Sequence, residues 1–194
     1  MMHIQAGLPI GTEEQAAALY WEAFGEKLGR VMGPHDKALA FIRRVLDPTH
    51  AISAVGPSGE LLGVAGFKTH ESALVGGSFE DMTAIYGWIG SVWRAVLVSF
   101  LERDTENERF LMDGIFVAPE ARGKGVGSAL LNGIMEEARK RGFESVRLDV
   151  IDTNPRARAL YERHGFKAHN TSEMGLLAPI FRFESATTMV RVLQ

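Results

Sequence analysis

A glycine-rich turn between an apolar strand and a helix is the part of the sequence best suited to chemistry. Glycines occupy alternate positions of residues 122–128, at Gly123, Gly125 and Gly127. Glycines at this spacing let several backbone N–H groups point at one place, and the helix that follows adds the positive end of its dipole. The turn therefore predicts a site for a phosphate-bearing anion. A flexible glycine loop without a ligand is the alternative, because short glycine patterns also arise by chance.

Two nucleotide-binding loops can be tested against this turn. A nucleotide P-loop requires Ser or Thr directly after its Gly-Lys pair, and here Lys124 is followed by Gly125. The dinucleotide fingerprint requires Gly or Ala at its last position. If the fingerprint starts at Gly123, its last position is Ser128. If it starts at Gly125, its last position is Leu130. Both patterns fail, so neither nucleotide loop explains the turn.

The segment after the turn has the pattern of an amphipathic helix. Val126, Leu130 and Ile134 recur at helical spacing, and Gly142 follows the basic residues 139–141. Cations in the last turn and a glycine behind them are typical of a helix end. The basic run is therefore explained without a nucleic-acid partner.

A second signature lies in residues 154–166, after an alternating strand pattern over residues 144–151. Asn154 suits a helix N-cap and Gly165 suits a helix end. Local rules explain both of these residues. They do not explain why this helix, one strand after the glycine turn, carries Tyr161.

Together, the two segments resemble the GNAT superfamily of acyl-CoA-dependent N-acetyltransferases. Arg122, Gly125 and Gly127 have the Arg-x-x-Gly-x-Gly spacing of its acyl-CoA pyrophosphate loop. Residues 154–166 follow the pattern Asn-x-x-Ala-x-x-Leu-Tyr-x-x-x-Gly-Phe of its second motif. The resemblance is closest over residues 110–166.

The resemblance implies an α/β fold of the mixed α+β kind, in which a strand and two helices precede a central mixed sheet with helices on both faces. The N-terminal third agrees, because a strand pattern is followed by two amphipathic helical patterns. Residues 56–60 then form a turn suited to a hairpin. No linker divides residues 1–194, so we expect one N-acetyltransferase domain.

The resemblance also implies which residues bind the donor, acetyl-CoA, with CoA as product and no metal. In this family the strand over residues 110–117 splays from its neighbour, and the backbone N–H of Val117 would face the thioester carbonyl. Asn154 and Ala157 would border the pantetheine and adenosine. Tyr161 would protonate the departing thiolate, with an aromatic packed in the core as the alternative. The implied donor-binding residues are Ile115, Phe116, Val117, Arg122, Gly123, Lys124, Gly125, Val126, Gly127, Ser128, Asn154, Ala157 and Tyr161.

A protonated amine must lose a proton before it can attack a thioester, so the chemistry needs a base. Asp113 is the first candidate, because the family often places an acidic base on this strand. On a regular strand Asp113 would share a face with Leu111 and Ile115. A strand carboxylate that pairs with an arginine or caps a turn is an equal alternative. Weaker candidates for the base are Glu71, Glu80 and Asp81.

Residues 72–107 depart from the family pattern, which turns quickly into the next strand. Ser78 and Asp81 form a capping-box pair before a long apolar helical pattern, which Gly87 and Gly90 would weaken or bend. We expect a helical insertion whose aromatic residues either wall the acceptor pocket or fill a second small core, with a homodimer contact left open. These aromatic residues are Tyr86, Trp88 and Trp93.

Composition sets further limits on the partners. Arg94 stands at the middle of the apolar residues 84–101, so we expect no membrane span there. A net charge of −3 gives no general attraction to nucleic acid or anionic membranes. The absence of cysteine excludes disulfides and a cysteine nucleophile, and the scattered histidines predict no metal site. The first residues lack the features of a signal peptide, so we expect a cytoplasmic location.

These features favour an N-acetyltransferase that moves an acetyl group directly from acetyl-CoA to a primary amine. The insertion narrows the groove that a protein tail would need, so we expect a small-molecule amine. The alternatives are acetylation of a protein N-terminus or lysine, and a non-catalytic acyl-CoA-binding regulatory module. Tyr161 favours the enzyme over the module. Tyr20, Phe24 and the loop around Arg30 are candidate acceptor contacts, although core packing is the favoured interpretation of the two aromatics.

Overall fold

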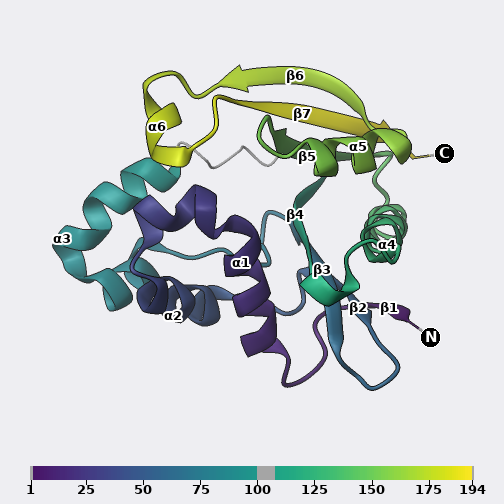
Figure 1. Ribbon diagram of the computed structural model, residues 1–194, viewed down its shortest axis with the longest axis horizontal. Coiled ribbons are helices and arrows are strands. Elements are labelled where there is room, and N and C mark those ends of the chain that lie inside the picture. The colour runs from purple at the N-terminus through teal and green to yellow at the C-terminus, as the bar shows by residue number, and fades with distance from the viewer. Residues whose placement is uncertain (1, 100–107, 194) are drawn as a thin grey trace.

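The computed structural model describes residues 2–99 and 108–193 (Figure 1). The chain begins with a strand and two helices, and the described strands form one seven-stranded sheet. The strands are β1 (His3–Ala6), β2 (Ala51–Val55), β3 (Leu61–Lys68), β4 (Phe110–Val117), β5 (Ser145–Ile151), β6 (Lys167–Glu173) and β7 (Ser185–Val192). The helices are α1 (Glu13–Met32), α2 (His35–Val45), α3 (Phe79–Ser99), α4 (Val126–Lys140), α5 (Pro155–Arg163) and α6 (Ala178–Phe181).

The sheet is mixed, as expected. Its order is β1-β2-β3-β4-β5-β7-β6, with β4 parallel to β5 and the other neighbouring pairs of described strands antiparallel. Different helices cover its two faces (Figure 1). A β-carbon added to Gly63 would contact Leu130 of α4, whereas one added to Gly114 would contact Phe24 of α1. The expectation of helices on both faces is confirmed.

Two apolar cores hold these layers together. The main core packs Leu130 and Ile134 of α4 against Leu148 of β5, and all three side chains are fully buried. The second core joins Phe41 of α2 and Met82 of α3 to residues of α1 and α6. Complete burial of such a side chain stabilises the fold by about 1.5–3 kcal/mol.

The insertion contains α3, which begins and bends as its sequence predicts. The Ser78 hydroxyl donates to the Asp81 carboxylate, 2.9 Å away, and the Asp81 N–H donates to the Ser78 hydroxyl at 3.2 Å. Gly87 has a φ of 70° and a kink interrupts the helix there. Tyr86 donates to the carbonyl of Met32, and Arg94 donates to the carbonyl of Gly33 at 3.0 Å. These bonds attach α3 to the end of α1. Residues 100–107 of the predicted insertion lie outside the described residues.

The aromatic residues of α3 do not behave as one group. Tyr86 is buried in the second core, in agreement with one of the two interpretations. Trp88 and Trp93 are 71% and 42% exposed, so they do not fill the second core, and they are not among the residues that line the cavity described below. Among the described helices, none is both long and apolar enough to cross a membrane.

Candidate active site

An opening separates β4 from β5. The two strands pair only at Phe110 and Leu111, although β4 continues to Val117. The N–H of Ala118 donates to the carbonyl of Leu62 on β3, at 2.9 Å. Because successive N–H groups of a strand point to opposite sides, the N–H of Val117 points into the opening. The same alternation directs the N–H of Ile115 into the opening and that of Phe116 toward β3.

The glycine turn lies at the start of α4 and leaves that helix end without a side-chain cap. Gly123 and Gly125 have φ values of 77° and 82°, a left-handed conformation that side chains disfavour. A β-carbon on either residue would have nothing within 4 Å, so there is open space over the turn. Gly125 is the N-cap of α4, and no side chain hydrogen-bonds to the cap. Backbone N–H groups at an uncapped helix start suit a phosphate group, so these residues fit the pyrophosphate of acyl-CoA.

Two side chains of the turn are engaged with other protein groups. Arg122 donates through Nε to the carbonyl of Val117 at 3.1 Å and forms an ion pair with Glu22 at 2.7 Å. The Ser128 hydroxyl lies 2.9 Å from Nε2 of His164. Burial and nearby arginines hold the pKa of His164 below its usual value. The donors that the turn itself presents to an anion are therefore its backbone N–H groups and the exposed Lys124.

The second motif forms the start of α5 as expected. The Asn154 side chain accepts from the N–H of Ala157 at 3.1 Å, which is an N-cap. Tyr161 is buried in the main core, with its ring centroid 6.0 Å from that of Phe166. Burial raises the pKa of Tyr161, so its hydroxyl stays protonated. Tyr161 is thus a core aromatic whose proton remains on oxygen at neutral pH.

A bulge in β4 sets the position of Asp113. Gly66 of β3 pairs with Gly114 of β4. The next residue of β3, Phe67, already pairs with Met112. Asp113 is left without a partner, so two residues of β4 stand opposite one of β3. Such bulges bend a strand and redirect its side chains.

The bulge corrects one expectation about the faces of β4. Ile115 and Met112 pair with residues two positions apart on β3, so their side chains lie on the same face. Leu111 lies on the other face, which α1 covers. The Asp113 carboxylate also lies on that side, where it interacts electrostatically with Tyr20 of α1. Asp113 therefore shares a face with Leu111 but not with Ile115, because the extra residue shifts the alternation.

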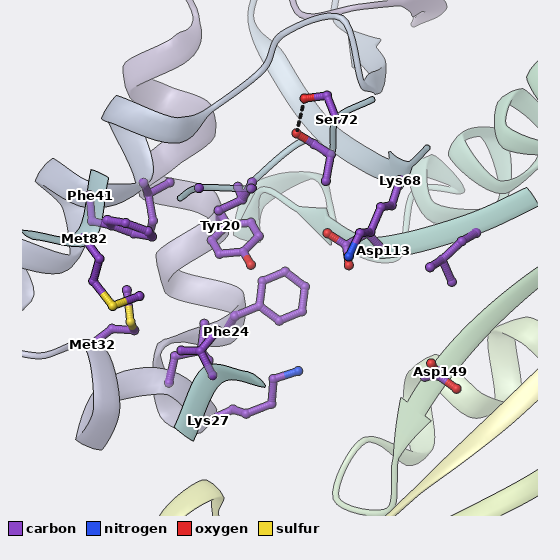
Figure 2. Close-up of a pocket in the computed structure, with 18 of the residues that line it drawn as sticks. Tyr20, Phe24, Lys27, Met32, Phe41, Lys68, Ser72, Met82, Asp113 and Asp149 are labelled. Carbon is purple, nitrogen blue, oxygen red and sulfur yellow. Dashed lines mark hydrogen bonds between the residues drawn. The ribbon is translucent and has the colours of Figure 1, made fainter. Parts of the chain in front are cut away.

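Asp113 lines a cavity of about 590 Å³ between the N-terminal helices, α3 and the strands β4 and β5 (Figure 2). Charged side chains gather near Asp113, while Phe41, Met82 and Met32 lie together at the other end (Figure 2). The charged residues of the lining are Lys27, Lys68, Glu71, Asp113 and Asp149, with His70 beside them. The insertion contributes Phe79, Met82, Ala95 and Val98 to the wall.

The Asp113 side chain is exposed to solvent through the cavity, although many protein atoms lie around its carboxyl. This enclosure raises the pKa of Asp113; Lys68 and Lys27 act against the rise, and Asp149 adds to it. Burial, reinforced by Asp113, also raises the pKa of Tyr20. A carboxylate with a raised pKa is a better proton acceptor than an ordinary aspartate.

The other candidate bases are placed less favourably. Asp81 binds Ser78 and forms an ion pair with Arg44 at 2.9 Å. Hydrogen bonds from Ser78 hold the pKa of Asp81 below its usual value. Glu71 lines the cavity, whereas Glu80 is exposed and is not among the lining residues.

Several lining residues were not singled out from the sequence. In the sequence, Asp149 is one polar residue of the alternating pattern over residues 144–151, and no pattern distinguishes Lys27 or Lys68. Tyr20 and Phe24 pack against the main core, as the favoured interpretation expects, and both also line the cavity. Arg30, the third such candidate, instead donates to the carbonyl of Pro179 in α6.

Sequence comparisons agree with the two motifs. Residues 14–166 match the acetyltransferase (GNAT) family. The uncharacterized N-acetyltransferase YhfO of Bacillus subtilis (strain 168) is 28% identical over 107 residues, which cover 53% of this chain and 64% of that protein. The thialysine N-epsilon-acetyltransferase of Bos taurus is 41% identical over 54 residues, which cover 28% of this chain and 32% of that protein. The matched stretches thus span less than two thirds of either relative.

Solved structures have the same fold over the whole chain. The crystal structure of an acetyltransferase superposes with a TM-score of 0.65 at 19% identity, covering 99% of this chain and 100% of the other. A histone acetyltransferase HPA2 and related acetyltransferase from Corynebacterium glutamicum ATCC 13032 gives 0.64 at 18% identity, covering 100% and 97%. Because the family match includes the glycine turn, the β4–β5 opening and the Tyr161 helix, the chain belongs to the acetyltransferase (GNAT) family.

Proposed function

We propose that this protein is an acetyl-CoA-dependent N-acetyltransferase whose acceptor is the primary amine of a small molecule, acetylated by direct transfer. The cavity that contains Asp113 is the observation that carries the proposal. Its volume of about 590 Å³ lies in the range of small-molecule sites, and α3 walls it. A protein segment would need a more open groove.

The donor residues follow from the opening between β4 and β5. Acetyl-CoA supplies the acetyl group as a thioester. The backbone N–H groups of Gly125 and of the start of α4 would hold its pyrophosphate. The N–H of Val117 would donate to the thioester oxygen, and the Tyr161 hydroxyl, which is protonated at neutral pH like that of any ordinary tyrosine, would give its proton to the departing sulfur.

The acceptor residues follow from the cavity. An ammonium group would place its nitrogen near the Asp113 carboxylate, which would take one proton directly or through water. The neutral nitrogen would then form its bond to the acetyl carbon as the carbon–sulfur bond breaks. The second proton that the nitrogen loses would return to Tyr161 through water, and Asp113 would release its proton to solvent. The enclosure that raises the pKa of Asp113 makes it a stronger base for this step.

A cavity-filling substitution tests where the acceptor binds. Ala95 of α3 lines the cavity, so Ala95→Phe should raise KM for small amines about tenfold or more while CoA binding is unchanged. Ala84 is exposed on the same helix and does not line the cavity, so Ala84→Phe is the matched control. CoA release measured with a panel of primary amines gives KM, and thermal unfolding checks both folds.

The same assay distinguishes the alternatives. Acetylation of peptide N-termini or lysines with no turnover of small amines would place the acceptor outside the cavity. Tight CoA binding without transfer to any amine or peptide would indicate a non-catalytic module. Equal KM values for Ala95→Phe and Ala84→Phe would remove the cavity from the proposal.

A further inference from the structure

The charged end of the cavity contains cations as well as carboxylates. Lys27 of α1 and Lys68 of β3 line it, and both interact electrostatically with Asp113. In Figure 2 the Lys68 side chain ends beside Asp113, and the Lys27 side chain ends near Phe24, with its Nζ 5.4 Å from the centroid of that ring. A site built only to attract an ammonium group would not place two lysines beside its carboxylate, because like charges repel.

The carboxylates at this end of the cavity differ in their hydrogen bonds and ion pairs with other protein groups. Asp149 accepts a hydrogen bond from Thr188 and lies 3.8 Å from the guanidinium of Arg147. Within the described residues, Asp113 has no hydrogen bond or ion pair of this kind. Of Asp113 and Asp149, Asp113 is therefore the carboxylate better placed to receive an ammonium group.

The charges around this end balance before any ligand binds. The lining carboxylates are those of Asp113, Asp149 and Glu71, and the lining cations are Lys27 and Lys68. Arg147 is not a lining residue, but it pairs with Asp149 and supplies the third positive charge. A simple alkylammonium would add one cation to a balanced set of charges. A ligand with both an ammonium and a carboxylate would leave the balance unchanged and pair each of its charges.

The opposite end of the cavity is apolar. Met32 of α1, Phe41 of α2 and Met82 of α3 meet there, and Ala95 and Val98 of α3 complete the wall. These side chains offer no charge and no strong hydrogen-bonding group to a ligand. They would favour an apolar substituent of the acceptor.

We infer that the acceptor is a zwitterionic amino acid with an apolar side chain, whose ammonium faces Asp113 and whose carboxylate faces Lys27 and Lys68. The side chain occupies the end formed by Phe41 and Met82. The inference rests on the proposed function, because the amino group of this ligand is the one that would be acetylated.

The first experiment compares amino acids with analogues that lack the carboxylate. Acetylation of L-phenylalanine and L-leucine is measured beside phenethylamine and isoamylamine. The expected result is a kcat/KM about tenfold to a hundredfold higher for the amino acids, the range expected for charge-assisted hydrogen bonds to a carboxylate. L-phenylalaninamide is the control for amine basicity, because it loses its proton readily but has no carboxylate, and it should react as poorly as the amines.

The second experiment removes the lysine charges and keeps their apolar stems. Lys27→Met and Lys68→Met should each lower the ratio of kcat/KM for L-phenylalanine to that for phenethylamine about tenfold, mainly through KM. Both substrates would give their proton to Asp113, so any effect of the lost lysine charge on Asp113 changes both kcat/KM values alike and cancels in their ratio. Lys140→Met changes an exposed lysine of α4 that does not line the cavity, and it should leave the ratio unchanged.

Calorimetric binding of L-phenylalanine without acetyl-CoA gives a readout that does not depend on turnover, and both lysine variants should weaken it. Equal or better acetylation of the decarboxylated amines would overturn the amino-acid inference and leave the proposed function standing. An unchanged ratio in both lysine variants would do the same. No transfer to any amino acid or amine would overturn the inference and the proposed function together.

Discussion

The ring of Phe24 lies against the backbone of Gly114, the residue that follows Asp113 in the β4 bulge. A β-carbon on Gly114 would stand 2.7 Å from Cζ of Phe24, closer than side chains pack. The β4 bulge and the Phe24 ring together allow α1 to pack on β4, and this packing places Tyr20 beside the Asp113 carboxylate. The position of the candidate base thus depends on one glycine.

Gly114→Ala should therefore destabilise the protein by about 1–3 kcal/mol, as overpacking does. The free energy of unfolding in urea measures this effect. Gly29→Ala is the matched control, because Gly29 lies in α1 and a β-carbon there has nothing within 4 Å. That change should stabilise the helix by about 0.5–1 kcal/mol. A Gly114→Ala protein as stable as the wild type would show that the contact with Phe24 is loose.

The glycine turn predicts a donor-binding effect that can be separated from stability. Gly125→Ala should cost about 1–2 kcal/mol of stability, because φ is 82° there, and should raise Kd for CoA about tenfold by displacing the start of α4. Gly142→Ala places the same strain, at a φ of 81°, behind the other end of α4. It should lower stability equally and leave Kd for CoA unchanged. Calorimetry measures Kd, and an unchanged Kd in both variants would argue against the turn as the pyrophosphate site.

Tyr161→Phe tests the general acid. Loss of the hydroxyl should lower kcat about a hundredfold with little change in Kd for CoA. Tyr86→Phe is the control, because Tyr86 donates to the Met32 carbonyl outside the donor site. It should cost about 0.5–1.5 kcal/mol of stability. Steady-state kinetics and thermal unfolding of both variants distinguish the two roles, and full turnover by Tyr161→Phe would remove tyrosine from the mechanism.

The raised pKa of Asp113 predicts how the stability of the protein depends on pH. An unfolded aspartate has a pKa of about 3.9, and enclosure holds the pKa of Asp113 above that value in the folded protein. Between the two pKa values the folded state binds more protons than the unfolded state, so the contribution of Asp113 to stability declines as the pH rises. Asp113→Asn cannot ionise, so it should be more stable than the wild type near neutral pH. The difference should shrink as the pH falls toward about 4.

Asp81→Asn is the control, because it should change the free energy of unfolding in the opposite direction. Hydrogen bonds from Ser78 lower the pKa of Asp81, so its contribution is present above the unfolded pKa and lost as the pH falls through the folded one. Asp81→Asn should therefore be less stable than the wild type near neutral pH. Urea unfolding across the pH range checks both signs. A destabilised Asp113→Asn protein would mean that the carboxylate is stabilised by its surroundings.

The parts of the site that follow local rules could be predicted from the sequence. Gly125 takes a left-handed conformation before a helix, and Asn154 caps the next helix, because each depends only on residues close to it in the chain. Ser78 and Gly87 set the start and the kink of α3 for the same reason. These residues were enough to indicate the donor site and the mixed fold.

The acceptor site could not be predicted in this way. The bulge at Asp113 arises from the register between β3 and β4, and no local pattern marks it. Lys27, Lys68 and Asp149 come from three separate elements that meet only after folding. The exposure of Trp88 was missed because an apolar helix pattern does not show which side of the helix is covered.

Identification of the acetylated product tests the central claim most directly. Wild-type protein is incubated with acetyl-CoA, small primary amines that include apolar amino acids, and unstructured peptides with free N-termini and lysines, and mass spectrometry identifies every product. The acetyl group should appear on a small amine, and its yield should fall when the Ala95→Phe variant replaces the wild type. Acetylated peptide with unmodified small amines, or no acetylated product while CoA binds, would contradict the account.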